Sequence, residues 1–360
     1  MPCIPPQFDE SPFIVIWEAT RACDLACTHC RAEAMPEPHA EQLTDDEVRG
    51  LIDHVRGEFG KVLFVITGGD PLKRPGLTEL IRYGDRAGLR MAITPSATPL
   101  LTPEAIAELR DAGIKRIAIS LDGADAATHD AFRGFPGTYE RTLRALEAAR
   151  DLGLEAQINT SVGEANRDQL PQIADLCRWY EISLWSVFIL VPTGRATEDL
   201  LMTAKQHEQV YRQLAELATQ PDLPFDIKTT AGQPFYRVRQ NVFKQAGLDP
   251  HARRGLRAPG GVNDGKGFVF VDHIGQVQPS GFLPINCGSI RERSLAAIYR
   301  FDPTFVRLRR PESFEGKCSW CEFHHACGGS RSRTYALTGD PFASDPTCVY
   351  HPKQVASMME

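Results

Sequence analysis

Phe13-Ile-Val-Ile-Trp17 is the first of six short apolar runs that alternate with helical patterns as far as about residue 191. Runs of this kind, rich in Val, Ile and Phe and ending near Gly, Ser, Thr or Asp, are typical of strands. The segments between them carry helix signals, such as the capping box that Thr44 and Glu47 can form. Strands that alternate with helices predict a parallel sheet with right-handed crossovers. The expected strands are residues 13–17, 62–67, 90–94, 116–121, 156–160 and 184–191.

Six strand–helix units are fewer than the eight of a closed barrel, so the predicted fold class is α/β, a partial (β/α)6 TIM-like barrel. Its helices are expected at residues 44–58, 102–112, 138–152 and 203–219. After about residue 250, Pro, Gly and Cys become dense and helical periodicity fades. There we expect a β-hairpin and a short helix, at residues 267–272 with 276–278 and at 294–299. We place the barrel domain at residues 1–225 and a small irregular domain, stabilised by bound metal, at residues 226–360.

The composition is that of an ordinary globular protein, and it excludes several classes. A net charge of −6 gives no reason to expect a nucleic-acid partner. The sequence contains no run of 18 or more apolar residues, so we predict no membrane span. The first ten residues lack the features of a secretory signal. We therefore expect a cytoplasmic protein, where ten cysteines indicate metal binding or catalysis rather than disulfides.

Three cysteines, Cys23, Cys27 and Cys30, directly follow the first apolar run. In a parallel barrel the loop after a strand lies on the catalytic face. Iron–sulfur clusters are usually held by four cysteines, so three within eight residues suggest a cluster with one open iron. Zinc is the alternative, with a fourth ligand from His29 or a distant residue. Of the isolated cysteines, Cys177 is expected in the core and Cys3 is given no role.

The spacing Cys-x3-Cys-x2-Cys, with His29 before the last cysteine, resembles the signature of the radical S-adenosylmethionine (SAM) family. The resemblance implies a 4Fe–4S cluster whose open iron binds the amino and carboxylate groups of SAM. One electron, from a donor such as flavodoxin or ferredoxin, would then yield methionine and a 5′-deoxyadenosyl radical. That radical would abstract hydrogen from a small-molecule or peptide substrate, while the protein positions and shields the chemistry.

Two further segments resemble parts of that family that contact SAM. Gly68-Gly69-Asp70-Pro71 resembles the Gly-Gly-Glu-Pro motif whose backbone meets the SAM amino group, with Asp in place of the usual Glu. Ser120-Leu-Asp-Gly123 and Arg133 resemble a segment of peptide-maturing members in which the Ser and Arg approach the SAM carboxylate. The alternative to a SAM contact is a purely structural role, in which the residue forms a turn or fills the barrel. The expected SAM contacts are Gly68, Gly69, Asp70, Ser120, Arg133, His29, Asn159 and Leu190.

The C-terminal cysteine group comprises Cys318, Cys321, Cys327 and Cys348. It resembles the SPASM extension of many radical SAM enzymes, whose full form holds two auxiliary clusters. Arg331 and Ser280 stand where that full form has cysteines, so the resemblance implies one auxiliary 4Fe–4S cluster and no second. A zinc ribbon is the alternative, although its second half would normally be another close cysteine pair. Cys287 is left unassigned.

Residues 267–271, 278–283 and 327–333 resemble the branch that modifies iron tetrapyrroles, in alternative haem and d-type haem biosynthesis. The resemblance implies oxidative decarboxylation or another side-chain modification of an iron tetrapyrrole. Arginines could pair with its propionates and histidines could approach its iron, although each could equally tune a cluster or lie in the core. These candidates are Arg253, Arg254, Arg257, Arg331, Arg333, His251, His273, His324 and His325.

Two other functions remain open at this point. SPASM enzymes often modify ribosomally made peptides, but such maturases usually carry an N-terminal domain that grips a leader peptide. Only about 12 residues precede the first expected strand here, which disfavours that function. The second alternative is a zinc-stapled α/β binding protein without enzymatic activity, for which the absence of iron would be diagnostic.

Overall fold

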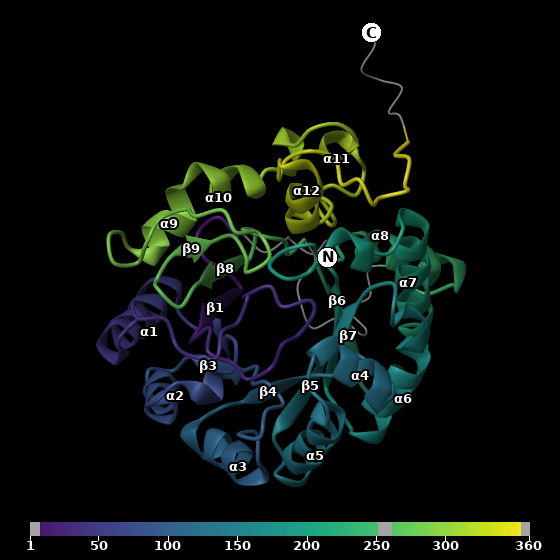
Figure 1. Ribbon diagram of the computed structural model, residues 1–360. Coiled ribbons are helices and arrows are strands. Elements are labelled where there is room, and N and C mark those ends of the chain that lie inside the picture. The colour runs from purple at the N-terminus through teal and green to yellow at the C-terminus, as the bar shows by residue number, and fades with distance from the viewer. Residues whose placement is uncertain (1–7, 251–260, 354–360) are drawn as a thin grey trace.

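A single curled sheet forms the centre of the computed structural model, which describes residues 8–250 and 261–353. The strand order is β7-β6-β5-β4-β3-β2-β1-β8-β9, and β1 to β7 all run parallel. Helices lie around the outside of the sheet (Figure 1). The seven parallel strands are β1 (Ile14–Glu18), β2 (Leu63–Thr67), β3 (Arg90–Ile93), β4 (Arg116–Ser120), β5 (Glu155–Val162), β6 (Leu184–Ile189) and β7 (Asp226–Thr230).

The first helix of the barrel begins with the capping box that the sequence predicts. Thr44 and Glu47 form the capping box of α1, with Thr44 N donating to Glu47 Oε2 over 2.7 Å. Thr102 caps α3 by accepting from the Ala105 amide. These helices are α1 (Asp45–Phe59), α2 (Leu77–Arg86), α3 (Pro103–Ala112), α4 (Ala126–Arg133), α5 (Thr138–Asp151), α6 (Leu170–Trp179), α7 (Ala204–Leu217) and α8 (Pro234–Gln245).

The predicted fold class, a partial TIM-like barrel, is confirmed, and the structure adds strand β7 to the six expected. The sequence analysis missed β7 because it looked for apolar runs. Only the outward face of β7, Ile227 and Thr229, is buried, while Lys228 and Thr230 face inward. Because Ile227 is its one apolar residue, β7 does not appear as an apolar run.

The expected β-hairpin forms from β8 (Phe268–Val271) and β9 (Val277–Gln278), which pair antiparallel. Strand β8 also pairs parallel with β1, so the segment after residue 260 completes one side of the barrel. The sequence did not show this pairing. The domain boundary at residue 225 stays a prediction, and β7 and β8 beyond it both belong to the barrel sheet.

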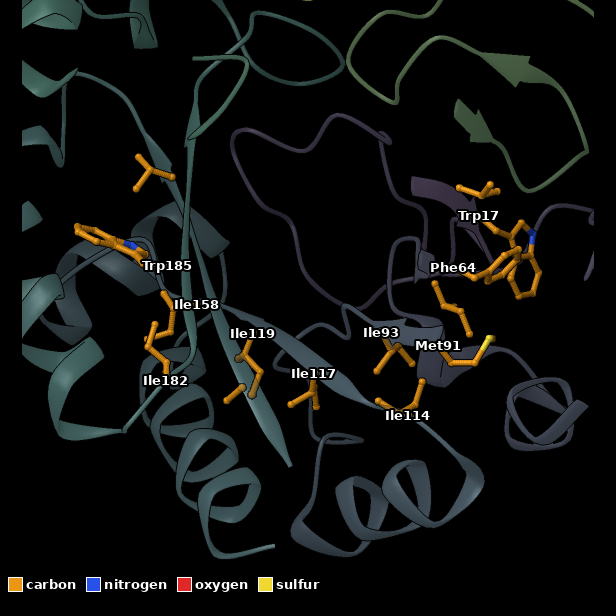
Figure 2. Packing of buried hydrophobic residues seen from close by; sticks show 14 of the residues in the cluster. Trp17, Phe64, Met91, Ile93, Ile114, Ile117, Ile119, Ile158, Ile182 and Trp185 are labelled. Carbon is orange, nitrogen blue, oxygen red and sulfur yellow. The ribbon is translucent and has the colours of Figure 1, made fainter. Parts of the chain in front are cut away.

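Alternation along the strands separates an outer core from an inner cavity. Trp17, Phe64, Ile117, Ile158 and Trp185 point outward and are buried against the helices (Figure 2). Because successive strand residues face opposite sides, their neighbours point into the barrel. The packed outer layer therefore stabilises the barrel, and the inner side chains are left to form a site.

The C-terminal region packs along one edge of the barrel (Figure 1). Tyr299 donates its hydroxyl proton to the Phe8 carbonyl over 2.6 Å, and the Ala296 amide donates to His54 Nε2 over 3.1 Å. Within the described ranges, no helix has both the length and the apolar character needed to cross a membrane. The helices of this region are α9 (Leu295–Phe301), α10 (Pro303–Leu308), α11 (Lys317–Trp320) and α12 (Arg331–Thr338).

Candidate functional site

A cavity of about 740 Å³ occupies the inside of the barrel. Inward side chains of strands β1 to β8 line it, and the loop after β1 borders it with Cys23, Cys27 and Cys30. The loop that contains these cysteines follows the carboxyl end of a strand, where parallel barrels carry their active sites. The structure therefore brings the predicted cysteine triplet to the main cavity.

Hydrogen-bond donors point at the sulfur atoms of the triplet. The Leu25 amide lies 3.4 Å from Cys23 Sγ, and the Ala34 amide lies 3.5 Å from Cys30 Sγ. Burial raises the pKa of the Cys23 and Cys27 thiols. Buried thiols give up their protons when a metal binds, and donors to sulfur tune the potential of iron–sulfur clusters. This donor set suits a cluster.

Arg133 is the cation beside the triplet. Its Nη1 lies 3.8 Å from Cys27 Sγ, and its Nη2 forms an ion pair with Asp122, which is fully buried. Burial raises the pKa of Asp122, but Arg133, nearby histidines and the Ser161 amide together outweigh burial and hold that pKa below its usual value. His29 Nε2 lies 3.9 Å from Asp122, and burial lowers the His29 pKa to about 4.

Asp122 is a site residue that the sequence analysis did not single out. It lies inside the segment Ser120–Gly123 that we quoted for its Ser. Its Oδ1 accepts from the Ser161 amide over 2.7 Å, and its own amide donates to His129 Nδ1 over 3.0 Å. A lone acidic residue in a turn carries no sequence signal that distinguishes an anchor for Arg133 from a surface residue.

Gly68 and Gly69 line the cavity, but the Asp70 carboxylate is used within the protein. A Cβ atom on Gly69 would lie 2.6 Å from the Ala22 carbonyl oxygen, so glycine lets this turn pack against the cysteine loop. Asp70 is fully buried, and its Oδ2 accepts from Thr98 Oγ1 over 2.7 Å. The Asp70 carboxylate therefore shapes the turn, and the SAM contacts expected of Gly68, Gly69 and Asp70 stay predictions.

The remaining predicted SAM contacts divide into two sets. Ser120 and Asn159 lie in the same register position on β4 and β5 and line the cavity. Leu190 is buried behind β6 beside Gly163, where a Cβ on that glycine would lie 3.4 Å from Leu190 Cδ1. The structure thus brings Ser120, Asn159 and Arg133 together with the triplet and leaves Leu190 in the core.

The four C-terminal cysteines surround a second, much smaller cavity of about 30 Å³. The Gly329 amide lies 3.3 Å from Cys327 Sγ, and the Asp345 amide lies 3.4 Å from Cys318 Sγ. Burial raises the pKa of the Cys321 thiol to about 11. In the described part of the chain, no three His, Cys, Asp or Glu side chains are close enough to hold a single metal ion.

The arginine and histidine candidates that the structure describes do not line the main cavity, and several form hydrogen bonds within the protein. Arg331 is fully buried and donates to the Pro341 and Ala343 carbonyls, with its Nη2 3.7 Å from Cys318 Sγ. Arg333 is fully buried and donates to the Ala231 carbonyl over 2.7 Å. His273 Nδ1 lies 2.9 Å from a Glu18 carboxylate oxygen.

Several other candidates are placed as follows. His324 and His325 lie side by side, with ring centroids 4.1 Å apart, and His324 borders the small cavity. Cys177 is fully buried in the core, as expected. Cys287 is also a core residue, and burial raises its pKa to about 12. The candidates outside the described residues are Cys3, His251, Arg253, Arg254 and Arg257.

Comparisons with known proteins agree with this geometry. The model of the radical SAM superfamily matches residues 17–177. The chain is 39% identical to the AdoMet-dependent heme synthase of Oleidesulfovibrio alaskensis, over 95% of this chain and 88% of that protein. It is 38% identical to the Methanosarcina barkeri protein of the same name, over 95% and 97%. This chain belongs to the radical SAM superfamily.

The fold of this radical SAM enzyme is also that of a solved member. Streptococcus suis SuiB bound to SAM superposes with a TM-score of 0.73, over 95% of this chain and 78% of SuiB, at 16% identity. Superfamily membership means an enzyme that uses a 4Fe–4S cluster and SAM, which removes the non-enzymatic zinc-binding alternative. The residues around the triplet fit that cluster, because three thiols, two of them buried, meet two amide donors and a guanidinium at the large cavity.

Proposed function

We propose that this radical SAM enzyme oxidatively decarboxylates propionate side chains of an iron tetrapyrrole. The observation that carries the proposal is the similarity of 38–39% identity, over nearly the whole chain, to AdoMet-dependent heme synthases. A cavity of about 740 Å³ also falls in the range of about 300–1,000 Å³ that is usual for small-molecule sites.

The reaction needs three events at one propionate. A hydrogen atom leaves the β-carbon, CO2 leaves the carboxyl end, and one further electron is removed, so that a vinyl group remains. SAM and the cluster, when bound, supply the radical that takes the hydrogen atom. The chain itself binds and orients the tetrapyrrole inside the barrel and keeps water from the reacting carbon.

The same proposal assigns the cysteine ligands of the SAM-binding cluster and the residues that contact SAM. Cys23, Cys27 and Cys30 would hold the SAM-binding cluster, with SAM contacts from His29, Gly68, Gly69, Asp70, Ser120, Arg133, Asn159 and Leu190. Among these, the cavity positions of Ser120 and Asn159 support a ligand contact, whereas the buried position of Leu190 offers less support.

An auxiliary 4Fe–4S cluster would be held by Cys318, Cys321, Cys327 and Cys348. It would supply an acceptor for the electron that decarboxylation releases. The support is that the four thiols border one small cavity and that backbone amides point at Cys327 and Cys318. Flavodoxin or ferredoxin would deliver the electron for SAM cleavage, and the enzyme would act in the cytoplasm.

The test is turnover by the anaerobically reconstituted enzyme with SAM, dithionite and iron coproporphyrin III, a propionate-bearing porphyrin. We expect mass spectrometry to show tetrapyrroles that have lost carboxyl groups, in step with 5′-deoxyadenosine formation. SAM cleavage without any change in the tetrapyrrole would contradict the substrate but not the superfamily. In that case a ribosomally made peptide would become the substrate to test.

A further inference from the structure

Four polar side chains form a row across the inner wall of the barrel. The register pairs Ser120 with Asn159, Asn159 with Ser186, and Ser186 with Lys228, across β4, β5, β6 and β7. All four line the main cavity. Paired residues of adjacent parallel strands point to the same face, so the four side chains are neighbours. We call Ser120, Asn159, Ser186 and Lys228 the polar row.

Two members of the polar row lack a polar partner of their own. Ser186 is fully buried, and its hydroxyl has no hydrogen-bond partner among the described residues. Lys228 forms no salt bridge within the described ranges, and its Nζ lies 5.2 Å from the centroid of the Phe268 ring. Buried polar groups are normally hydrogen-bonded, so an unpaired hydroxyl beside an unpaired ammonium requires an explanation.

The surroundings of Lys228 disfavour its charge in the absence of an anion. Burial, and next the positive charge of Arg116, lower the pKa of Lys228 to about 8. An ammonium group in a site that excludes water is stabilised most effectively by a negative partner. The cavity therefore favours a ligand that brings an anionic group to the β7 side.

The polar row adjoins an apolar wall of the cavity, where Phe268 lies beside Lys228. Ile16 on β1, Val65 on β2, and Phe268 and Phe270 on β8 all line it. Aromatic side chains offer large flat surfaces for an apolar ligand. A ligand that satisfies both walls carries an aromatic body and at least one anionic group at its edge.

We propose that Lys228 and Ser186 bind a carboxylate of the substrate, with the aromatic body of the substrate against β1, β2 and β8. The choice of a tetrapyrrole propionate as that carboxylate rests on the proposed function. Ser120, at the other end of the row, is three strand spacings of about 4.8 Å away from Lys228. Asn159, the nearer of the expected SAM contacts in the row, is two such spacings, or about 10 Å, from Lys228. The carboxylate at Lys228 therefore orients the substrate rather than reacting.

Under this proposal Lys228 and Ser186 recognise the substrate carboxylate, in place of the arginines that the C-terminal sequence suggested. Arg331 and Arg333 are fully buried and already donate to backbone carbonyls, Arg331 to Pro341 and Arg333 to Ala231. Lys228 is partly accessible, and it lines the cavity.

The test measures the preference of the reconstituted enzyme for an acid over its uncharged analogue. The first probe pair is iron coproporphyrin III and its tetramethyl ester, followed by Soret difference titration. The second pair, 1-pyrenebutyrate and 1-pyrenebutanol, presents a carboxylate without a tetrapyrrole and is followed by calorimetry. The variants are Lys228→Met, Lys228→Arg and Ser186→Ala, with Lys205→Met on the exposed face of α7 as the matched loss of charge.

We expect Lys228→Met to weaken binding of the acid by about ten- to a hundredfold and to leave ester binding within about twofold. Ser186→Ala should weaken acid binding by about threefold, and Lys228→Arg should retain most of it, as should Lys205→Met. If Lys228→Met fails to fold, by iron content and melting temperature, Ser186→Ala decides. A fall of about threefold in the acid preference of that variant supports the inference, and an unchanged preference overturns it.

The outcomes separate this inference from the proposed function. If the wild type binds the porphyrin acid and ester equally, the carboxylate site is overturned while the tetrapyrrole substrate stands. If the wild type binds neither porphyrin, the proposed function fails, and the pyrene pair decides on Lys228. A preference for pyrenebutyrate that Lys228→Met abolishes would support the carboxylate site, and no preference would overturn it.

Discussion

The two cysteine groups offer similar ligands but very different space. The triplet at Cys23, Cys27 and Cys30 borders a cavity of about 740 Å³, whereas the C-terminal four surround one of about 30 Å³. Three thiols beside a large cavity leave room for SAM and a substrate. Four thiols around the small one leave no room for either. Cavity size, more than ligand chemistry, distinguishes the proposed site of bond breaking from the proposed site of electron transfer.

The sites also differ in how the fold holds them. The triplet occupies eight residues of one loop, and Arg133 reaches it from the end of α4. The C-terminal four span residues 318–348, and the buried Arg331 and Asp345 of the same segment both contact Cys318. The C-terminal site is therefore built into its own small core, whereas the triplet depends on the barrel around it.

The strongest test of this contrast is Cys23→Ala/Cys27→Ala/Cys30→Ala. Because these thiols are proposed to hold the SAM-binding cluster, we expect reductive SAM cleavage to be lost and bound iron to fall by about four per chain. Iron and sulfide analysis with EPR, after anaerobic reconstitution, makes the measurement. Unchanged iron content or retained SAM cleavage would show that the triplet is not the radical site.

The reciprocal variant is Cys318→Ala/Cys348→Ala. We expect it also to lose about four irons, yet to keep reductive SAM cleavage within about threefold while tetrapyrrole decarboxylation falls at least about tenfold. Uncoupled 5′-deoxyadenosine formation, compared with product formation, measures the difference. Cys177→Ala, which alters a core cysteine outside both groups, is the control and should keep all of the iron. If the reciprocal variant lost SAM cleavage as completely as the triplet variant, the two cysteine groups would not have the separate roles proposed for them.

Local rules explain which elements the sequence could predict. The capping box of Thr44 and Glu47 and the proline start of α3 depend on residues a few positions apart, so both were visible. Strand β7 was not, because its inward residues are polar and its outward face adds Thr229, so Ile227 is its one apolar residue. Strand β5 also has polar inward residues, but its outward face is apolar enough to show the pattern.

The candidate site also divides into features that local sequence spacing predicts and features that depend on the folded arrangement. Cysteine spacing is local, and it identified both groups of thiols. The use of the Asp70 carboxylate by Thr98, 28 residues further along the chain, and the pairing of Asp122 with Arg133 depend on the folded arrangement. The parallel pairing of β8 with β1 is longer in range still, and no spacing in the sequence announces it.

Asp122→Asn tests how strongly the barrel holds the open site. It leaves the guanidinium of Arg133 buried without its ionic partner, and breaking a buried pair in this way costs about 3–5 kcal/mol. The matched control is Asp111→Asn, an exposed partner of Arg110, for which we expect at most about 1 kcal/mol. Urea unfolding of both variants gives the comparison. Equal losses would show that the buried pair does not anchor the triplet.

Glu18→Gln tests the link between the open site and the C-terminal region. Glu18, at the end of β1, lies 3.0 Å from Arg31, the residue after Cys30, and 2.9 Å from His273, which follows β8. Burial raises the pKa of Glu18, but Arg31 and His273 outweigh burial and hold that pKa at about 2, against 4.5 ordinarily. The ionised carboxylate therefore contributes stability of about 3 kcal/mol at neutral pH.

The pH dependence of this contribution has a definite sign. Because the folded pKa lies below the unfolded one, the stabilisation is complete above about pH 4.5 and is lost as the pH falls through about 2. In urea unfolding of the metal-free protein, the wild type should exceed Glu18→Gln by about 3 kcal/mol at pH 7 and by less than half of that at pH 3. Glu108→Gln, on the exposed face of α3, should show no gap at either pH. A gap for Glu18→Gln that does not narrow would mean that the variant disturbs packing rather than charge, and that the two regions are joined by burial alone.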